Sequence, residues 1–384
     1  DPRQEGCEYP FKGLCGAAVA YKFVEALCEA NGQDVADLDY LLENVAIATV
    51  ADVMDLTEEN RILVKQGLEM LKRTSNLGLR ALIQCIGLEG KKIQAYHIGF
   101  ILAPCLNASG KLDTAKRALA LLRAKTEREA DMLAGDLKAL NESRRDMTDR
   151  VVDEAMAKVE QTDIRGDKVL VIYLPDCHES LAGLVAGRVR ENYYRPVFVL
   201  TDSEDGVKGS GRSIESYSMY EELTGCGDLL TKFGGHPMAA GLSLDKENVE
   251  KFKRRLNDQC TLSEEELTEK VVIDMELPFA AITEHFIEEL EYMEPFGKGN
   301  TKPVFAARGV VMQHVKIIGK NKNVAKATAI DVAGNRMEAI CFHDAQEFAE
   351  RCERNNGKMS ITFYPGINEF RGERKIQIVI THYR

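Results

Sequence analysis

The sequence predicts an α/β protein with an added β domain: a helical first part, a sheet in the middle and a small barrel at the end. Three observations predict this. Apolar residues recur with helical spacing through most of the first 160 residues. Two short continuous apolar runs, at 169–173 and 196–200, enclose a helical pattern and are typical of strands buried on both faces. Five short β-rich runs then close the chain.

Composition sets limits on the function. The 384 residues fit about two to three domains, and 45% hydrophobic content is ordinary for a globular protein. A net charge of −11 argues against non-specific coating of nucleic acid but leaves room for a local basic groove. No apolar run is long enough to span a membrane, so we expect no membrane partner. The 10 cysteines form no Cys-x-x-Cys pair, which argues against a zinc cluster and favours a reduced, cytoplasmic protein.

The helical first part contains one acidic residue that stands out. Residues 15–30 have the small, apolar pattern of a helix, and 46–56 is rich in alanine and valine yet carries Asp52 and Asp55. A carboxylate on a buried segment is costly unless it is paired or binds a metal. Asp55 fits a cap of the next helix. Asp52 fits a cap less well, and it is either structural or a metal ligand.

A polar segment of small residues follows at 104–111, and we expect it to be a loop. It offers three side chains for hydrogen bonds or a phosphate: Asn107, Ser109 and Lys111. The alternative is the plain N-terminus of the next helix. Residues 113–160 then keep a helical period with few breakers, which predicts a helical region that connects two domains and exposes a charged face.

The middle of the chain predicts a βαβ unit, with a helix at 179–191 between the two apolar runs. His178 lies at the turn from strand to helix, and ligands of open α/β sheets bind at that end of a strand. His178 is therefore a candidate for substrate binding, with a structural histidine as the alternative.

Two further polar segments follow in the same domain. In 207–214, glycines permit close approach and three side chains can hold a phosphate: Ser210, Arg212 and Ser213. In 232–244, Gly234 and Gly235 can present successive N–H groups to an anion, with His236 beside them. The alternatives are a hairpin turn and a tight turn with a structural histidine. Three such loops within one sheet domain, at 177–180, 208–213 and 234–236, together predict a groove that tracks phosphates.

The last part predicts a five-stranded barrel of the oligonucleotide-binding (OB) type, from β-rich runs at 303–318, 324–331, 336–342, 359–364 and 375–382. A helix is expected at 286–292, and 295–300 is expected to be a turn. A basic groove could be formed by Lys316, Lys320, Lys322, Lys326, Arg371, Arg374 and Lys375, and bases could stack on Phe363, Tyr364 and Phe370. The alternative is an ordinary solvated surface.

Taken in order, the motifs of this chain resemble the RecJ family, the single-strand-specific 5′→3′ DNA exonucleases of the DHH phosphoesterase superfamily. The resemblance covers essentially the whole chain. It is carried by Ala-Thr-Val-Ala-Asp-Val at 48–53, Leu-Asn-Ala-Ser-Gly at 106–110, His178 with Gly-Leu-Val-Ala-Gly-Arg at 183–188, Lys-Gly-Ser-Gly-Arg-Ser at 208–213, Phe-Gly-Gly-His at 233–236 and Pro-Phe-Gly-Lys-Gly-Asn at 295–300.

The resemblance implies a role for each matched segment. It implies that Asp52 is a ligand of the catalytic divalent metals and that Asn107 and its neighbours lie near the active cleft. It implies that a DHH-associated domain holds the scissile end of the strand through Ser210, Arg212, Ser213, Gly234, Gly235 and His236. The implied division is the C-terminal part of a DHH domain at 1–112, a connecting helical region at 113–160, the DHH-associated α/β domain at 161–262 and an OB-like domain at 270–384.

The implied reaction is hydrolysis of phosphodiester bonds in single-stranded DNA, in DNA repair and recombination, with two Mn²⁺ or Mg²⁺ ions. The aspartate-rich and Asp-His-His motifs of the family do not occur in this chain and are expected upstream of Asp1. We therefore expect the chain alone to bind single strands with an incomplete metal site and little or no nuclease activity. Catalytic roles are expected for Asp52 and His236. A single-strand-binding protein is an expected partner, and the protein is expected to be a monomer.

Two other functions stay open at this point. One is a phosphodiesterase of the same superfamily that acts on short oligonucleotides or cyclic dinucleotides, although such substrates need no strand-binding barrel. The other is a relative without catalysis that only binds single strands, although the presence of Asp52 argues against it.

Overall fold

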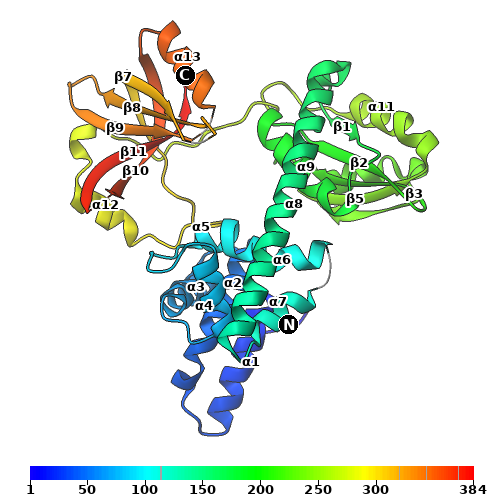
Figure 1. The fold of residues 1–384 in the computed structure, drawn as a ribbon. Helices are drawn as coiled ribbons and strands as arrows, with labels where there is room; N and C mark the ends of the chain where they lie inside the picture. Colours follow the sequence, from blue (N-terminus) through cyan, green and yellow to red (C-terminus); the bar gives the residue numbers. More distant parts are fainter. Residues whose placement is uncertain (113–114, 320, 343, 371) are drawn as a thin grey trace. The chain divides into compact units, whose positions relative to one another are not determined.

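The computed structural model describes residues 1–384 apart from 113–114, 320, 343 and 371, and it describes no side chain at 109–112 or 370. The chain forms two compact units. One comprises residues 1–75, 88–103 and 271–384, and the other comprises 76–87 and 104–270. Figure 1 shows helices in the N-terminal part, a sheet in the middle of the chain and a barrel at its end, so the predicted class of fold is confirmed.

The helices of the first unit pack around one small core that includes Ala18, Val45 and Leu63. The helix α2 ends at Ala51, and Asp52 follows as its C-terminal cap. The helical elements of this part are α1 (Gly16–Ala30), the 3₁₀ helix η1 (Val35–Leu41), α2 (Leu42–Ala51), α3 (Glu58–Leu71), α5 (Ala95–His97) and the π-helical turn η2 (Ile98–Leu102).

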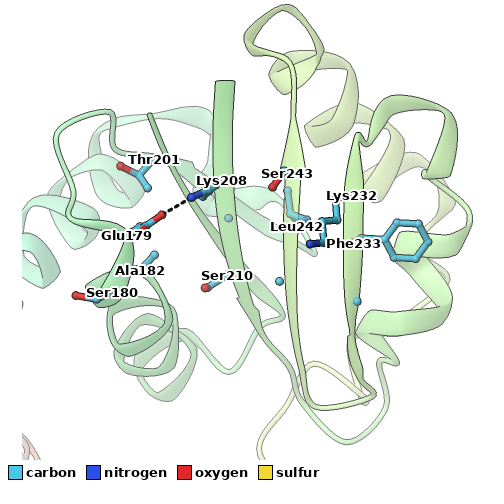
Figure 2. Close-up of a pocket in the computed structure, with 13 residues that line it drawn as sticks. Glu179, Ser180, Ala182, Thr201, Lys208, Ser210, Lys232, Phe233, Leu242 and Ser243 are labelled. Atoms are coloured by element: carbon cyan, nitrogen blue, oxygen red, sulfur yellow. Dashed lines mark hydrogen bonds and ion pairs between the residues drawn. The ribbon is translucent and has the colours of Figure 1, made fainter. Parts of the chain in front are cut away.

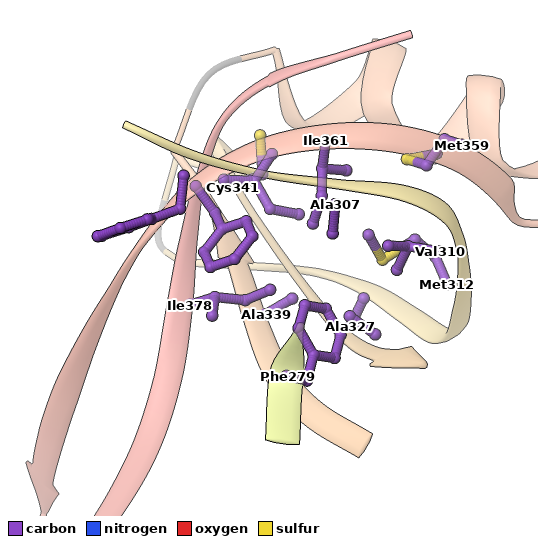
Figure 3. Close-up of a cluster of buried hydrophobic side chains, with 14 of the residues drawn as sticks. Phe279, Ala307, Val310, Met312, Ala327, Ala339, Cys341, Met359, Ile361 and Ile378 are labelled. Atoms are coloured by element: carbon purple, nitrogen blue, oxygen red, sulfur yellow. The ribbon is translucent and has the colours of Figure 1, made fainter. Parts of the chain in front are cut away.

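The barrel of the first unit closes because β10 pairs with both β11 and β7, in a sheet of order β10-β11-β9-β8-β7-β6. β9 and β11 run parallel, and β6 joins β7 in parallel. The elements are β6 (Met275–Glu276), the 3₁₀ helix η6 (Phe279–Ala281), α12 (Glu284–Glu291), β7 (Phe305–Ile318), β8 (Val324–Ile330), β9 (Arg336–Cys341), α13 (Ala345–Arg354), β10 (Lys358–Phe370) and β11 (Glu373–Tyr383). Both helices contribute to the apolar core of the barrel, part of which is drawn in Figure 3. The predicted strands and the helix near 286–292 are confirmed, whereas α13 has no counterpart in the sequence prediction.

The core of the barrel changes the interpretation of its aromatic residues. Phe363 is fully buried and packs against Phe279 and Phe305, so the prediction that it stacks on bases is wrong. Strand alternation explains this, because Phe363 points inward on β10 and the next residue, Tyr364, points away. Tyr364 is partly buried under the ammonium group of Lys302, which lies 4.3 Å from its ring centre. The predicted positions Lys320 and Arg371, and the side chain of Phe370, lie outside the described residues.

Helices of the second unit lead into its sheet. They are α4 (Leu77–Cys85), α6 (Ala103–Leu112, from Pro104 onward), α7 (Lys116–Leu122), α8 (Glu127–Gln161) and the 3₁₀ helix η3 (Asp163–Gly166). The 35 residues of α8 correspond to a helix about 52 Å long. Its first half packs on α4 and α7, and its second half packs on α9 and β1. Thr126 caps α8 by accepting from the Glu129 N–H, and this cap divides the predicted helical region in two.

The sheet of the second unit has the strand order β1-β2-β3-β5-β4, with β1 and β2 parallel and the other neighbours antiparallel. Its elements are β1 (Leu170–Tyr173), α9 (Glu179–Tyr193), β2 (Val197–Ser203), β3 (Gly206–Arg212), α10 (Met219–Thr224), η4 (Gly227–Leu229), β4 (Lys232–His236), β5 (Ala239–Leu244), η5 (Lys246–Asn248) and α11 (Val249–Gln259). One face of β1 and β2 packs on α8 and α9, and the opposite face of the sheet packs on α10 and α11.

Three segments expected to be loops are regular structure instead. Residues 104–111 belong to α6, because Pro104 stands in its first turn, where no N–H is needed, and glycine occurs only near its end. Residues 208–212 lie in β3, and 234–236 lie in β4. Gly209, Gly211 and Gly235 allow these strands to pack closely, and the sequence alone does not distinguish a glycine in a strand from a glycine in a turn. Only 177–180 lies where a strand passes to a helix, as predicted.

Candidate nucleic-acid interface

The open part of the sheet carries three parallel rows of residues across β3, β5 and β4. Strand register places Lys208, Ser243 and Lys232 in the first row, Ser210, Gly241 and Gly234 in the second, and Arg212, Ala239 and His236 in the third. Because side chains alternate between the faces of a strand, all nine positions share one face. Within the described part of the chain, the helix α9 packs on that face over β2 and β3, and the strands β5 and β4 extend beyond this contact.

A pocket of about 570 Å³ lies on this face, between the N-terminal half of α9 and the strands β3, β5 and β4 (Figure 2). Gly234 and Gly241 make its floor: a Cβ atom on Gly234 would have no neighbour within 4 Å, and one on Gly241 would be 3.9 Å from the nearest atom. The floor is therefore bare backbone, which lets a ligand approach it closely. The hydroxyl-bearing residues Ser210 and Ser243 line the same pocket.

The other glycines of these strands serve the core instead. A Cβ atom on Gly211 would lie 2.7 Å from the Phe198 ring, and one on Gly209 would be 3.2 Å from Leu242. Gly235 has φ +152°, and its Cβ atom would be 2.6 Å from Cα of Ala240. Gly234 and Gly235, which the sequence presents as one pair, therefore have different roles: Gly234 faces the pocket, and Gly235 allows close packing of β4 on β5.

Charged residues surround the pocket. Lys208 and Lys232 line it from β3 and β4, and Glu179 lines it from the first turn of α9. The Lys208 ammonium group lies 2.8 Å from the Glu179 carboxylate, and this hydrogen bond and charge hold the pKa of Glu179 below its usual range. No hydrogen bond or ion pair involves the ammonium group of Lys232 among the described residues. The positive rim and the N-terminus of α9 make the pocket suitable for a phosphate.

Arg212 and His236 lie one row away from the residues that line the pocket. The guanidinium group of Arg212 lies under α9, where a Cβ atom on Gly183 would be 2.8 Å from its Nη2, and its Nη1 donates to the Gly211 carbonyl. Burial, and then the charge of Arg190, lower the pKa of Arg212. His236 is exposed at the end of β4. Both side chains lie on the same face of the sheet as the pocket, Arg212 partly covered by α9 and His236 exposed, and they continue the pocket along the strands.

Two predicted binding residues have structural roles. Ser213 is 1% exposed, and its hydroxyl donates to the Tyr217 carbonyl at 2.6 Å, so the prediction that it binds substrate is not supported by its position. His178 caps α9: its Nδ1 accepts from the Ser180 N–H at 3.3 Å and lies 2.7 Å from the Ser180 hydroxyl. The ring is exposed beside the pocket but does not line it.

The remaining predicted residues lie outside the pocket. Asn107 is exposed on α6, and the side chains of Ser109 and Lys111 lie outside what the structure describes. Asp52 belongs to the first unit, where its carboxylate is exposed and takes part in no hydrogen bond or ion pair with the described residues. A free carboxylate is the oxygen ligand that Mg²⁺ and Mn²⁺ prefer. Among the described residues, however, no group of three or more potential metal ligands occurs, so Asp52 can be only one ligand of several.

Sequence reasoning missed part of the pocket: Glu179, Thr201, Lys208, Lys232 and Ser243. The available signal was the period of two in 208–212, which places Lys208 on the face of Ser210 and Arg212 once the segment is taken as a strand. The structure also gives no helix long and apolar enough to cross a membrane, within the residues it describes.

Two regions of the chain match models of known domain families. Residues 166–262 match the model of the DHHA1 domain, and residues 273–382 match the model of the RecJ OB domain. The sheet with its glycine floor and the barrel thus define a protein that joins a DHH-associated domain to an OB domain.

Whole-chain relatives identify the family. The single-stranded-DNA-specific exonuclease RecJ of Salmonella typhimurium is 32% identical over 99% of this chain, and the match covers 69% of that relative. The RecJ exonuclease of Bacillus subtilis is 36% identical over 99% of this chain, and the match covers 48% of that relative. The crystal structure of RecJ with Mg²⁺ from Thermus thermophilus matches 98% of this chain and 57% of that chain, with a TM-score of 0.81 and 26% identity. The chain belongs to the RecJ family. It spans about half the length of the Bacillus subtilis relative.

Proposed function

We propose that this chain is the strand-binding part of a RecJ-type 5′→3′ exonuclease that hydrolyses phosphodiester bonds in single-stranded DNA, in repair and recombination. The observation that carries the proposal is the pocket, a bare glycine floor with hydroxyls and cations around it. Such a surface is suited to a sugar–phosphate backbone, because lysines, hydroxyls and bare backbone are the groups that contact phosphates and sugars and fix the register of a strand. The names of the relatives and the OB-type barrel support the same substrate.

In this proposal each group of residues has one task. The floor residues Gly234 and Gly241 let a phosphate approach the sheet, and Lys208 and Lys232 neutralise its charge. Arg212 and His236 hold the neighbouring phosphate one row along the strands. Gly235 shapes β4 for this purpose, and Ser210 donates a hydroxyl hydrogen bond. The backbone therefore enters in one register, and sequence has little influence on binding.

We propose that Asp52 supplies one ligand to the catalytic Mn²⁺ or Mg²⁺ ions. A bound divalent cation would polarise the phosphate and supply an activated water. The structure of a relative with Mg²⁺ supports a divalent metal, and the exposed, unpaired Asp52 carboxylate supports its role. The roles of Asn107, Ser109 and Lys111 near the cleft, and the domain division at 1–112, 113–160, 161–262 and 270–384, remain part of this proposal.

We further propose a monomer that works in the cytoplasm beside a single-strand-binding protein, on the strength of the family alone. Sedimentation of the chain with and without such a protein tests both points. A stable dimer, or no change in sedimentation on mixing, contradicts the corresponding part.

The function is tested by separate binding and cleavage measurements on one labelled oligonucleotide. We expect the 384-residue chain to bind the single strand and not the matched duplex. It should cleave little with Mn²⁺, because the described residues contain no group of three or more potential metal ligands. The protein as the cell makes it should release mononucleotides from a 3′-labelled strand, starting at the 5′ end. Equal binding of duplex, or degradation from the 3′ end, contradicts the proposal.

A further inference from the structure

The 295–300 loop, which the sequence presents as a plain turn, packs on the segment that carries Asp52. We call residues 52–57 the Asp52 turn. The Leu56 N–H donates to the Lys298 carbonyl at 2.6 Å, and the Lys298 ammonium group lies 2.9 Å from Oδ1 of Asp55. Both contacts lie within the first compact unit. They join two segments that are more than 230 residues apart in the sequence.

Glycine is required in this loop for the contact to form. A Cβ atom on Gly297 would lie 2.7 Å from Cδ1 of Leu56. One on Gly299 would lie 3.0 Å from Cβ of Asp55, and Gly299 also has φ +75°, which L side chains rarely adopt. The spacing of Gly-x-Gly thus fits the loop to the Asp52 turn.

Two polar side chains fix the loop from either side. Arg61 of α3 directs one guanidinium nitrogen, Nη2, at the carbonyls of Tyr292 (3.0 Å) and Met293 (3.1 Å). Asn300 uses its amide nitrogen to donate to the carbonyls of Met293 (2.8 Å) and Pro295 (2.9 Å). Hydrogen bonds from a charged donor are the stronger kind. The carbonyl groups after α12 are therefore tied to the helix that follows the Asp52 turn.

The stretch of chain that leads into the loop, from α12 to Phe296, is part of the barrel. Ile287 and Leu290 of α12 are buried in the barrel core. Phe296 makes an edge contact with the Tyr364 ring of β10, with ring centres 6.1 Å apart. The same short stretch of chain thus contacts the barrel with one end and the Asp52 turn with the other.

The Asp52 turn itself has a backbone that needs support. Val53, directly after Asp52, has φ +54°, which is strained for a β-branched residue. Such conformations persist where neighbouring groups over-determine them. Here the buried Asn60 donates to the Asp55 carbonyl at 3.0 Å, and the 295–300 loop holds the next N–H, that of Leu56.

We propose that the 295–300 loop is a positioning element for Asp52: it holds the Asp52 turn in the conformation that presents the carboxylate to a divalent cation, and it ties this turn to the barrel. This inference rests on the proposed metal-binding role of Asp52. Asp52 remains the ligand, and the loop acts only through the turn.

The test compares Gly299→Ala with Gly334→Ala. Gly334 also has a positive φ, +88°, but a Cβ atom there meets nothing within 4 Å, so Gly334→Ala repeats the backbone strain in the same unit without the contact. We expect Gly299→Ala to speed hydrogen exchange of the Leu56 amide on the order of tenfold, as expected when its hydrogen bond opens more often. Gly334→Ala should leave this exchange unchanged.

A second readout follows the metal. Mn²⁺ is titrated against the protein as the cell makes it, and free Mn²⁺ is followed by electron paramagnetic resonance. We expect Gly299→Ala to raise the half-saturating Mn²⁺ concentration several-fold and Gly334→Ala to leave it unchanged. Arg61→Met, with Arg73→Met as control, repeats the comparison without altering a glycine, in case Gly299→Ala does not fold. Arg73 is exposed just beyond α3, and among the described residues its hydrogen bonds are to Met70 alone.

The outcomes separate this inference from the proposed function. If the unsubstituted protein binds no Mn²⁺, the proposed function and the positioning role both fail. If it binds Mn²⁺ and both Gly299→Ala and Arg61→Met leave the half-saturating concentration unchanged, only the positioning role fails. If the Leu56 amide exchanges faster in Gly299→Ala but Mn²⁺ binding is unchanged, the positioning role also fails and the proposed function stands.

Discussion

The open sheet face and the barrel surface are both candidates for strand binding, yet their cations are arranged differently. On the sheet, Lys232 and Arg212 form no ion pair among the described residues, and only Lys208 is paired, with Glu179. On the barrel, three of the predicted groove cations are already neutralised: Lys326 by Glu338 and Lys375 by Glu373, each at 2.8 Å, and Arg374 by Glu284 at 3.6 Å.

This difference in ion pairing indicates which surface should contribute more of the free energy of strand binding. A phosphate that approaches a paired lysine must compete with the carboxylate, whereas one that approaches a free lysine only displaces water and counterions. A count of basic residues in the sequence therefore overestimates the contribution of the barrel to strand binding and underestimates the contribution of the sheet. We expect the sheet face to supply most of the electrostatic affinity for a single strand.

The largest effect is expected from Lys208→Ala with Lys232→Ala. Loss of both pocket cations should weaken binding of a single strand on the order of tenfold or more at fixed salt, because two phosphate contacts are lost. The matched control is Lys326→Ala with Lys375→Ala on the barrel, which should weaken binding less because both of these lysines are paired, whereas on the sheet only Lys208 is. Fluorescence anisotropy with a labelled oligonucleotide measures both. A larger loss from the barrel pair would reverse the comparison.

The two adjacent glycines of β4 allow strand binding and stability to be tested separately within the sheet. Gly234→Val should weaken strand binding several-fold without loss of stability, since its side chain enters open space on the pocket floor. Gly235→Ala should lower the free energy of unfolding by about 1–3 kcal/mol, because its Cβ atom would collide with β5. Urea denaturation and anisotropy separate the two. Equal losses of stability would show that Gly234 is not on an open floor.

Ser213→Ala distinguishes a structural serine from a binding one. Removal of the buried hydroxyl should cost about 1 kcal/mol of stability, since the hydrogen bond to the Tyr217 carbonyl is lost, and should leave strand affinity unchanged. Ser210→Ala is the control on the pocket face. It should weaken strand binding and leave the free energy of unfolding unchanged. Loss of affinity with Ser213→Ala at unchanged stability would restore the role that the sequence predicted for it.

The smallest effect is expected from Glu179→Gln. Removal of this carboxylate should tighten strand binding about two- to threefold, because Lys208 is freed and one negative charge leaves the pocket. The gain should shrink at high salt. Weaker binding by Glu179→Gln would show that the Glu179–Lys208 pair orients the lysine toward the strand and does not compete with it.

Much of the fold could be predicted from the sequence, because its periods are local. The βαβ unit, the barrel strands and α1 follow from hydrophobic spacing, and the structure confirms them. The loops at 208–213 and 234–236 could not be recognised as strands, because glycine in a strand has the same local signature as glycine in a turn. Only the packing of Gly209 and Gly211 against Leu242 and Phe198 distinguishes the two.

The candidate site was predictable in part for the same reason. The sequence indicates Ser210, Gly234 and their neighbours because small and polar residues cluster there. It does not indicate that Ser213 points into the core or that Lys232 joins the rim, since both depend on register between strands. The contact of Lys298 with the Asp52 turn depends on segments far apart in sequence, and no local pattern contains that information.

The central claim is that the sheet face holds the backbone of a single strand. It is tested most directly by the salt dependence of strand binding for the unsubstituted chain and for Lys208→Ala with Lys232→Ala, with His236→Ala and Arg212→Ala as a second pair and matched duplex as control. Each lost phosphate contact lowers the slope of log affinity against log salt by about 0.7 for a single strand. We predict single-strand-selective binding and a slope lower by about 0.7 to 1.4 for the lysine pair, the lower figure applying if the Glu179 carboxylate already neutralises Lys208. Equal binding of duplex, or an unchanged slope in both pairs, would contradict the account and leave the barrel as the binding surface.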